Sequence, residues 1–225
     1  MLGRWGVGAE VTPAFERLIA ALASEPDPPT TVREPAAILA RHVADSLAGL
    51  EVDALSGART VADIGAGAGF PALALALARP EAGPFDLVES ARRKSEVIDR
   101  LIAASGAANA RAVLSRAEDW GRERREAYDA VTARAVAALP VLCEYAAPLL
   151  RPGGVLVAWK GARDEGEDRA GARAAAELGL RSVDVLFVRP FAGAHSRHLH
   201  VYEKVAPTPE RFPRRAGLAA KRPLA

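Results

Sequence analysis

The chain has 225 residues, half of them hydrophobic, and its 30 basic and 28 acidic residues give a formal charge of +2 at pH 7. This size allows one sizeable core without a second domain, and the near balance of charge predicts no uniform attraction to nucleic acid. No apolar run approaches the roughly 20 residues that cross a bilayer, and no basic segment followed by an apolar one opens the chain. We therefore expect a cytoplasmic protein with no membrane partner.

Cysteine and histidine usage argues against disulfide and metal chemistry. Cys143 is the only cysteine and lies in an apolar stretch, without a companion for an intramolecular disulfide. None of the four histidines stands in a ligand-like repeat with acids or with this cysteine. We expect Cys143 in the core, no metal site, and a monomer.

Two helices are predicted before residue 60, at 10–23 and 34–50, with a proline-rich break between them. From residue 60 onward strands alternate with helices, which predicts a parallel sheet covered by helices on both faces. The predicted strands are 60–64, 85–89, 111–115, 128–134, 154–160, 181–188 and 198–204. Residues 190–194 are too few for a crossover helix, so the last two strands should pair as an antiparallel hairpin at one edge. The fold class is therefore α/β: a Rossmann-like, seven-stranded, mostly parallel sheet whose last strand is antiparallel, with a small N-terminal helical cap.

A glycine-rich turn follows the first predicted strand. Asp63 stands two residues before the first of three alternating glycines, Gly65, Gly67 and Gly69, and such a turn lets the backbone approach a nucleoside-bearing cofactor closely. A dinucleotide fingerprint needs a further glycine at position 70, where this chain has Phe70, so hydride transfer is disfavoured. An acid two residues before G-x-G-x-G is the pattern of S-adenosylmethionine-dependent methyltransferases. The alternative is that the glycines merely terminate a strand.

The second predicted strand ends at Glu89, some two dozen residues after Asp63. An acid at the tip of this strand is expected to bind the cofactor's ribose hydroxyls. The alternative is an exposed acid at a strand end.

Several further motifs together resemble one family, the bacterial 16S ribosomal RNA guanine N7-methyltransferases, also called glucose-inhibited division protein B. The resemblance covers roughly residues 30 to 225. The motifs, in chain order, are Arg41-His42-x-x-Asp45-Ser46-Leu47, the turn from Asp63 to Pro71, Val88-Glu89-Ser90, Arg134-Ala135-Val136, Lys160-Gly161, Arg197-His198-Leu199, and a tail with Thr208-Pro209, Pro213-Arg214-Arg215-Ala216-Gly217 and Lys221-Arg222-Pro223-Leu224. Ala72 and Ala133 depart from the family pattern, which commonly has glycine and serine there.

The resemblance implies transfer of a methyl group from S-adenosylmethionine to N7 of guanine 527, in the 530 loop of 16S rRNA, with naked rRNA or the small ribosomal subunit as partner. N7 carries an in-plane lone pair and no proton, so no general base is required. Rate is expected from positioning and electrostatics. The implied organisation is an N-terminal cap at 1–50, an S-adenosylmethionine-binding methyltransferase domain at 51–205 and a basic tail at 206–225.

The resemblance also implies a set of cofactor-binding residues. It places Glu89 at the ribose, Ala117 and Glu118 near the adenine, and Arg134 beside the methyl group as the catalytic candidate. The complete set is Asp63, Gly65, Gly67, Gly69, Phe70, Glu89, Ser90, Ala117, Glu118 and Arg134. Alternatively, Glu118 only complements a helix dipole and Arg134 is only an ion-pair partner.

The helix carrying His42, Asp45 and Ser46 either closes the cofactor pocket or presents an ordinary surface histidine, with Arg41 and Asp45 as an i,i+4 ion pair.

The expected RNA face combines strand-end cations with the basic tail. Residues 211 to 225 hold five cations and no acid, so this segment can order on RNA, with Phe212 available to stack on a base. The predicted RNA-binding residues are Lys160, Arg197, Arg214, Arg215, Lys221 and Arg222, and Lys160, Arg134 and Arg197 are expected to form a continuous basic surface. The alternative is a disordered, solvated tail.

Other functions stay open: a methyltransferase acting on a small molecule or on another RNA, and a nucleic-acid-binding module without catalysis. Deleting residues 211–225 is expected to abolish RNA methylation while cofactor binding survives.

Overall fold

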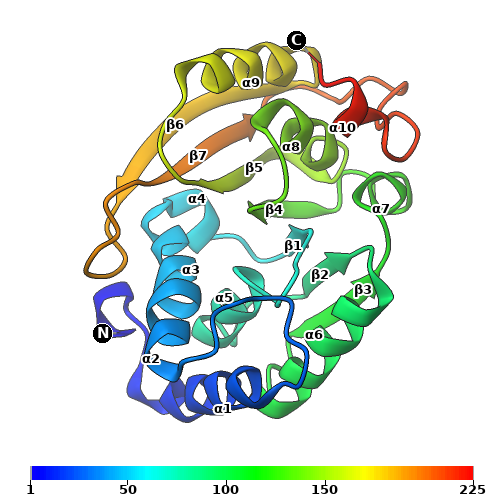
Figure 1. Ribbon diagram of the computed structural model, residues 1–225. Helices are drawn as coiled ribbons and strands as arrows, with labels where there is room; N and C mark the ends of the chain where they lie inside the picture. Colours follow the sequence, from blue (N-terminus) through cyan, green and yellow to red (C-terminus); the bar gives the residue numbers. More distant parts are fainter. Residues whose placement is uncertain (1, 225) are drawn as a thin grey trace.

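Seven strands form one twisted sheet in the order β3-β2-β1-β4-β5-β7-β6 in the computed structural model, which describes residues 2–224 (Figure 1). The strands are β1 (Val61–Ile64), β2 (Phe85–Glu89), β3 (Ala110–Leu114), β4 (Tyr128–Arg134), β5 (Leu150–Lys160), β6 (Leu180–Val188) and β7 (Arg197–Lys204). The first five pair in parallel, whereas β7 runs antiparallel to both β5 and β6. The predicted fold class and the edge hairpin are confirmed.

Helices surround this sheet. The α-helices are α1 (Thr12–Ser24), α2 (Pro35–Ile38), α3 (Asp45–Leu47), α4 (Asp53–Ser56), α5 (Ala72–Ala78), α6 (Arg92–Ser105), α7 (Ala117–Glu123), α8 (Leu139–Ala146), α9 (Glu165–Glu177) and α10 (Leu218–Lys221). Short 3-10 segments are η1 (Leu2–Trp5), η2 (Ala9–Val11) and η4 (Ala48–Glu51). None of the helices within residues 2–224 is long and apolar enough to cross a membrane.

The predicted helix at 34–50 is helical from Pro35 onward but not uniform. Its middle, η3 (Leu39–Ala44), is a π-helix, in which the Asp45 amide donates to the carbonyl of Ala40, five residues back. Such wide turns are frequent at functional sites. This one carries Arg41 and His42 and is capped by Asp45, so these three residues of the motif lie on or directly after an irregular turn.

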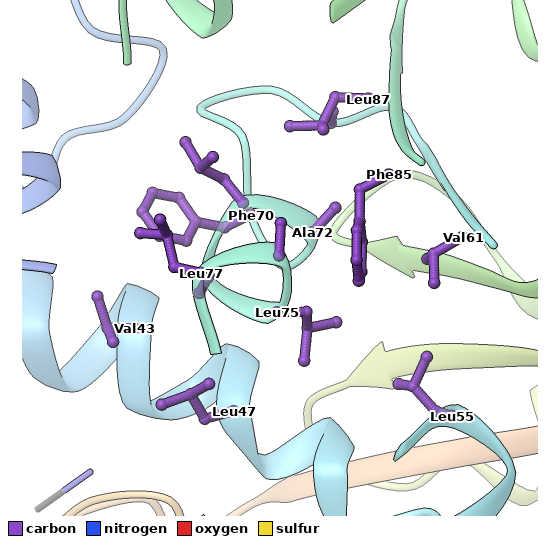
Figure 2. Close-up of a cluster of buried hydrophobic side chains, with 14 of the residues drawn as sticks. Val43, Leu47, Leu55, Val61, Phe70, Ala72, Leu75, Leu77, Phe85 and Leu87 are labelled. Atoms are coloured by element: carbon purple, nitrogen blue, oxygen red, sulfur yellow. The ribbon is translucent and has the colours of Figure 1, made fainter. Parts of the chain in front are cut away.

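Each face of the sheet has its own hydrophobic core, because successive strand residues point to opposite faces. Val61 and Phe85 belong to the core beneath α1, α5 and α6, and Ala62 and Val88 to the core beneath α7, α8 and α9. Figure 2 shows α5 in the first core, between the sheet and the helix that carries Leu47. Six of the seven residues of α5 are buried, so this short helix anchors the glycine turn that precedes it.

The C-terminal tail is folded against α7 and α8 (Figure 1). Phe212 is only 2% exposed and belongs to the second core, and Arg125 donates to its carbonyl at 2.9 Å. The prediction that Phe212 is available to stack on a base is therefore wrong, because its ring is consumed by packing. Cys143 is buried, as predicted.

The order of the strands reverses between β1 and β4. From β1 the chain moves outward to β2 and β3, and then returns to β4 on the other side of β1. In open α/β sheets, ligands bind beyond the carboxyl ends of the strands at such a switch point. The glycine turn follows β1 there, and Arg134 ends β4.

Candidate active site

A cavity of about 770 Å³ opens at the switch point. The glycine turn, η3, the residues after β4 and the end of β5 contribute to its walls. Its lining includes Thr30, Arg41, His42, Asp45, Gly65, Gly67, Phe70, Lys94, Arg134, Val136, Trp159, Lys160 and Arg197. A smaller cavity of about 170 Å³ lies next to it, lined by Gly65, Ser90, Ala117, Glu118, Val136 and Tyr145 among others. Gly65 and Val136 line both cavities, so the two adjoin across these residues.

The three glycines of the turn have different roles. All three have positive φ, +68° at Gly65, +58° at Gly67 and +88° at Gly69, a conformation that favours glycine. A Cβ at Gly67 would meet nothing nearer than the Gly65 carbonyl oxygen at 3.8 Å, so a ligand can approach this backbone. Gly69 is buried against Leu73 and lines neither cavity.

Glu89 holds the turn in place. Its Oε2 accepts from the Gly67 amide at 3.1 Å and its Oε1 accepts from the Ala91 amide at 2.9 Å. Glu89 is only 6% exposed, so it is not an exposed strand-end acid. Each carboxylate oxygen keeps further acceptor capacity, which fits the hydroxyls of a ribose beside the turn.

Asp63 lies beneath the turn and lines neither cavity. It is completely buried, and its Oδ1 accepts from the Thr132 hydroxyl at 2.8 Å. Burial raises the pKa of Asp63 to about 7, although hydrogen bonds from Thr132 and the Ala72 amide oppose this rise. Asp63 therefore supports the turn from below.

Glu118 lies at the smaller cavity and is only 4% exposed. Its Oε1 accepts from the Gly217 amide at 2.7 Å, across 99 residues of chain. It also lies in the first turn of α7, so the alternative of an acid that complements the helix dipole is compatible with its position. The C-terminal tail thus contacts a residue that was predicted to lie near the adenine.

Arg134, the last residue of β4, contacts the helical segment that carries His42 and Asp45. Its Nη1 donates to Asp45 Oδ2 at 2.9 Å, and its Nη2 lies 3.1 Å from His42 Nδ1. The guanidinium carbon lies 5.6 Å from the centre of the Phe70 ring. Burial lowers the pKa of Arg134, and the charge of Asp45 opposes that change. Arg134 is thus both an ion-pair partner and part of the cavity wall.

His42 is a neutral member of this wall. Its ring stacks on Phe70 with centroids 4.9 Å apart, and its Nε2 lies 3.0 Å from the Thr30 hydroxyl. Because Arg134 can only donate, Nδ1 must accept and Nε2 must carry the hydrogen. Burial, followed by the charge of Arg134, lowers the pKa of His42 to about 4. The interpretation as a surface histidine is wrong, and the predicted Arg41–Asp45 pair is replaced by pairs from Asp45 to Arg134 and Arg197.

Ser46 is fully buried and donates to the His42 carbonyl at 2.5 Å, so it does not reach the cavity.

Sequence reasoning missed Trp159 and Val136. Trp159 lines the cavity, and its Nε1 donates to the Asp45 carbonyl at 2.8 Å. Its place directly before Lys160, at the carboxyl end of a central strand, was the available signal. Val136 packs over Gly65, where an added Cβ would fall 2.7 Å from Val136 Cγ2.

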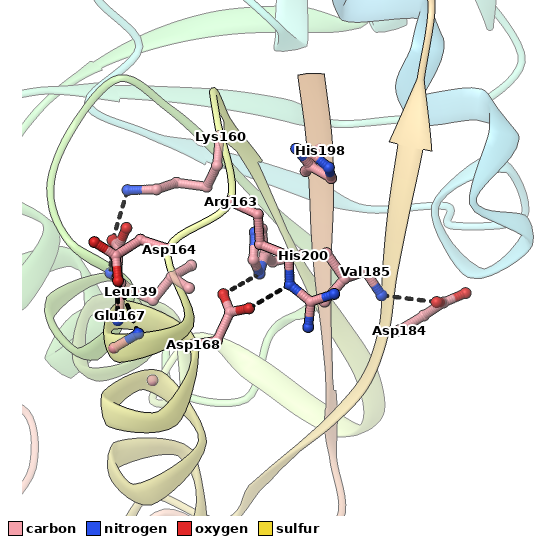
Figure 3. A network of polar contacts seen from close by, with 12 residues as sticks. Leu139, Lys160, Arg163, Asp164, Glu167, Asp168, Asp184, Val185, His198 and His200 are labelled. Carbon is pink, nitrogen blue, oxygen red and sulfur yellow. Dashed lines mark hydrogen bonds and ion pairs between the residues drawn. The ribbon is translucent and has the colours of Figure 1, made fainter. Parts of the chain in front are cut away.

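The three cations of the predicted basic surface, Lys160, Arg134 and Arg197, line one cavity, but each is paired with an acid. Lys160 Nζ lies 2.6 Å from Glu167 Oε1 of α9 (Figure 3). Arg134 and Arg197 share Asp45. A buried acid of α3, Asp45, thus faces two of the cations and a half-buried acid of α9, Glu167, faces the third, contacts that their spacing in sequence does not reveal.

The tail cations divide into two groups. Arg214 is bound to Glu144, a buried acid of α8, through its backbone amide and its guanidinium. Arg215, Lys221 and Arg222 are exposed and form no ion pair within residues 2–224. Only the second group is available to an external partner in this arrangement.

The sheet order and the glycine turn define a methyltransferase of the Rossmann-like class, and solved structures share this fold. A SAM-dependent O-methyltransferase from Thermotoga maritima superposes with a TM-score of 0.61 at 16% identity, over 86% of this chain and 73% of the other. The 16S rRNA (adenine(1408)-N(1))-methyltransferase from Catenulisporales acidiphilia gives a TM-score of 0.54 at 20% identity, over 70% of this chain and 90% of the other.

Sequence comparison identifies the family. Residues 29–200 match the GidB family, described as rRNA small subunit methyltransferase G. A protein named ribosomal RNA small subunit methyltransferase G from Deinococcus deserti is 48% identical, over 83% of this chain and 77% of its own length. The protein of the same name from Deinococcus radiodurans is 44% identical, over 97% and 88%. The chain belongs to this family of methyltransferases, and the resemblance drawn from its motifs is confirmed.

Proposed function

We propose that this chain transfers the methyl group of S-adenosylmethionine to N7 of guanine 527, in the 530 loop of 16S rRNA, and that it acts in the cytoplasm as a monomer. Family membership supports a ribosomal RNA target. The observation that carries the proposal is the pair of adjoining cavities at the switch point. The larger cavity is lined by the glycine turn and by basic residues, and the smaller one by Gly65, Ser90 and Glu118.

The residues at the turn fit the proposed cofactor. Gly65 and Gly67 present backbone without side chains, and Glu89 offers acceptors beside them. Ser90, Ala117 and Glu118 line the smaller cavity, which suits an adenine. Phe70 and Arg134 line the larger cavity on the other side of Gly65. Asp63 and Gly69 would act indirectly, by supporting the turn.

When bound, S-adenosylmethionine supplies an electrophilic methyl group on a sulfonium. The chain then needs to orient the target base and does not need to remove a proton, because guanine N7 carries none. A neutral His42 is consistent with this, since it adds no charge to the cavity wall and its one lone pair, on Nδ1, is engaged by Arg134. Arg134 remains the catalytic candidate. It would act through its positive charge and through its fixed position in the cavity wall.

The proposed RNA face differs from the predicted one. Arg215, Lys221 and Arg222 of the tail are the exposed cations with which it would contact phosphates. Lys160 and Arg197 lie at the cavity, where they are paired with acids, and Arg214 serves first to hold the tail. RNA contact by the last three would require exchange of these partners.

The test is transfer of labelled methyl from S-adenosylmethionine to small ribosomal subunits that lack the modification, followed by mapping of the labelled nucleotide. Label on N7 of the 530-loop guanine is the expected result. Cofactor binding without label in RNA would overturn the proposal and favour a small-molecule acceptor. Naked 16S rRNA, assayed in parallel, identifies which form of the substrate is used.

A further inference from the structure

Asp45 holds an unused acceptor at the cavity. Its Oδ2 accepts from Arg134 at 2.9 Å. Its Oδ1 lies 3.1 Å from Arg197 Nε in an ion pair, yet no N–H or O–H of residues 2–224 is aligned to donate a hydrogen bond to it. Asp45 is only 3% exposed. Because buried carboxylate oxygens are nearly always hydrogen-bonded in native proteins, this covered oxygen at the cavity wall can take a donor from a ligand once the Arg197 side chain, which is 40% exposed, moves off it.

The position of Asp45 is held from several sides. Trp159 Nε1 donates to its backbone carbonyl at 2.8 Å, and the π-turn ends at its amide. A Cβ at Gly49 would fall 2.5 Å from the Trp159 ring, so the helix and the indole are packed closely. A group held in this way is suited to recognition, because little is lost in ordering it when a ligand binds.

The local charge indicates what kind of donor Asp45 accepts. Two guanidinium groups, those of Arg134 and Arg197, already surround this single carboxylate. A further cation, such as an ammonium group, would meet net positive charge there. A neutral N–H group would not be repelled by this charge. A carbonyl oxygen next to it on the ligand would be attracted by the same arginines.

We propose that Asp45 selects guanine as the base to be methylated. Its carboxylate would accept from the N1–H and the exocyclic amino group of the base, and the half-exposed guanidinium of Arg197 would donate to O6. This inference rests on the proposed function and adds the residue that determines specificity. N7 occurs in adenine as well as guanine, so a site that presents N7 to the cofactor must distinguish the purines by their C6 substituent or at the N1 and C2 edge. Adenine offers an acceptor at N1 and no amino group at C2, and would leave Asp45 unpaired.

The experiment compares subunits carrying guanosine at the target position with subunits carrying inosine, which lacks only the C2 amino group. The quantity measured is kcat/KM for methyl transfer to N7 with each substrate. We expect the wild-type protein to methylate inosine about tenfold or more slowly, the size of effect associated with loss of a directional base contact. In Asp45→Asn, we expect the guanosine rate to fall about a hundredfold and the ratio between the two bases to fall close to one.

A matched control is Asp129→Asn. Asp129 is also a buried acid paired with an arginine, Arg151, and also has an Oδ1 without a hydrogen bond, but it lies near the amino end of β4. This variant should keep the wild-type ratio. Circular dichroism and thermal unfolding of both variants test whether they fold, and calorimetry with S-adenosylmethionine should give Asp45→Asn an affinity within about twofold of wild type.

Three results would overturn the assignment of Asp45 while leaving the proposed function intact. The first is equal wild-type rates on guanosine and inosine, which does not depend on any variant folding. The second is a ratio of guanosine to inosine rates in Asp45→Asn that equals the wild-type ratio, as a purely structural role predicts. The third is a loss of cofactor affinity that matches the loss of rate. Absence of transfer to guanosine subunits by the wild-type protein would instead overturn the proposed function itself.

Discussion

Buried carboxylates determine much of the chemistry at the scale of single residues. Asp45, Asp63 and Glu89 are all less than a tenth exposed, yet each has a different set of partners. Asp45 pairs with arginines, Glu89 accepts backbone amides, and Asp63 has only a hydroxyl and one amide. Within residues 2–224 Asp63 has no ion pair, and burial raises its pKa.

Asp63 should make the protein less stable as the pH rises. Its pKa is about 7 in the folded chain, against an ordinary value of 3.8. Between these values the folded chain keeps a proton that the unfolded chain has lost, so stability present below about pH 4 is lost on the way to pH 7. Asp63→Asn removes this titration. Denaturant unfolding at pH 4 and pH 8 measures the free energy of unfolding of both proteins. The value for Asp63→Asn relative to wild type should be roughly 4 kcal/mol higher at pH 8 than at pH 4.

His42 makes stability change with pH in the opposite direction. It is present in both wild type and Asp63→Asn, so its contribution cancels from the difference between them. Its lowered pKa makes stability rise with pH between about 4 and 6.5. A difference between wild type and Asp63→Asn that stays constant with pH would contradict the prediction.

Arg134→Lys should lower kcat/KM for methyl transfer by about a hundredfold. Lysine keeps the charge but cannot reproduce a planar guanidinium that contacts Asp45, His42 and the Arg41 carbonyl together. The control is Arg151→Lys, which alters another arginine paired with a buried acid, Asp129, away from the cavity. Equal activity of Arg134→Lys and wild type would show that charge alone suffices.

At the scale of elements, the tail behaves as part of the fold. Arg214→Ala leaves Glu144 buried without its cation, which typically costs about 3–5 kcal/mol. Arg215→Ala, one residue away and exposed, should change stability by less than about 0.5 kcal/mol. Thermal and denaturant unfolding of the two variants test this contrast, and equal stabilities would contradict it.

Deletion of residues 211–225 is consequently not a clean test of RNA binding. It removes Phe212 from the second core and strips partners from Glu144 and Glu118. We now expect the deletion to reduce stability and cofactor binding together, contrary to the expectation from sequence. Alanine at Arg215, Lys221 and Arg222 together should instead spare the cofactor and weaken subunit binding, as calorimetry and filter binding can measure.

At the scale of the whole molecule, pairing of charges matters more than their sum. Among the cations that line the larger cavity, Arg41 and Lys94 are exposed and have no ion pair within residues 2–224. If each neutralises one phosphate, replacing either by alanine should reduce the slope of log K against log salt for subunit binding by about 0.7–0.9. Arg181→Ala, at the start of β6 and paired with Glu203, should leave the slope unchanged.

The sequence by itself determined the architecture, because local patterns encode it. Short strand-like segments alternating with helical ones located all seven strands, the short segment before residue 197 required an antiparallel hairpin, and the glycine turn with Glu89 indicated the end of the sheet at which a cofactor would bind. These features depend on backbone conformation and on residues close together in the chain.

Only the tertiary structure decided which charged side chains are free. Arg134 and Asp45 are 89 residues apart and Arg214 and Glu144 are 70 apart, so no local spacing reveals that they are paired. The same holds for Phe212, whose ring is buried by helices far from it in sequence. Because the energy of a charge depends on the partners that folding brings to it, the chemistry of this site is a property of the folded molecule.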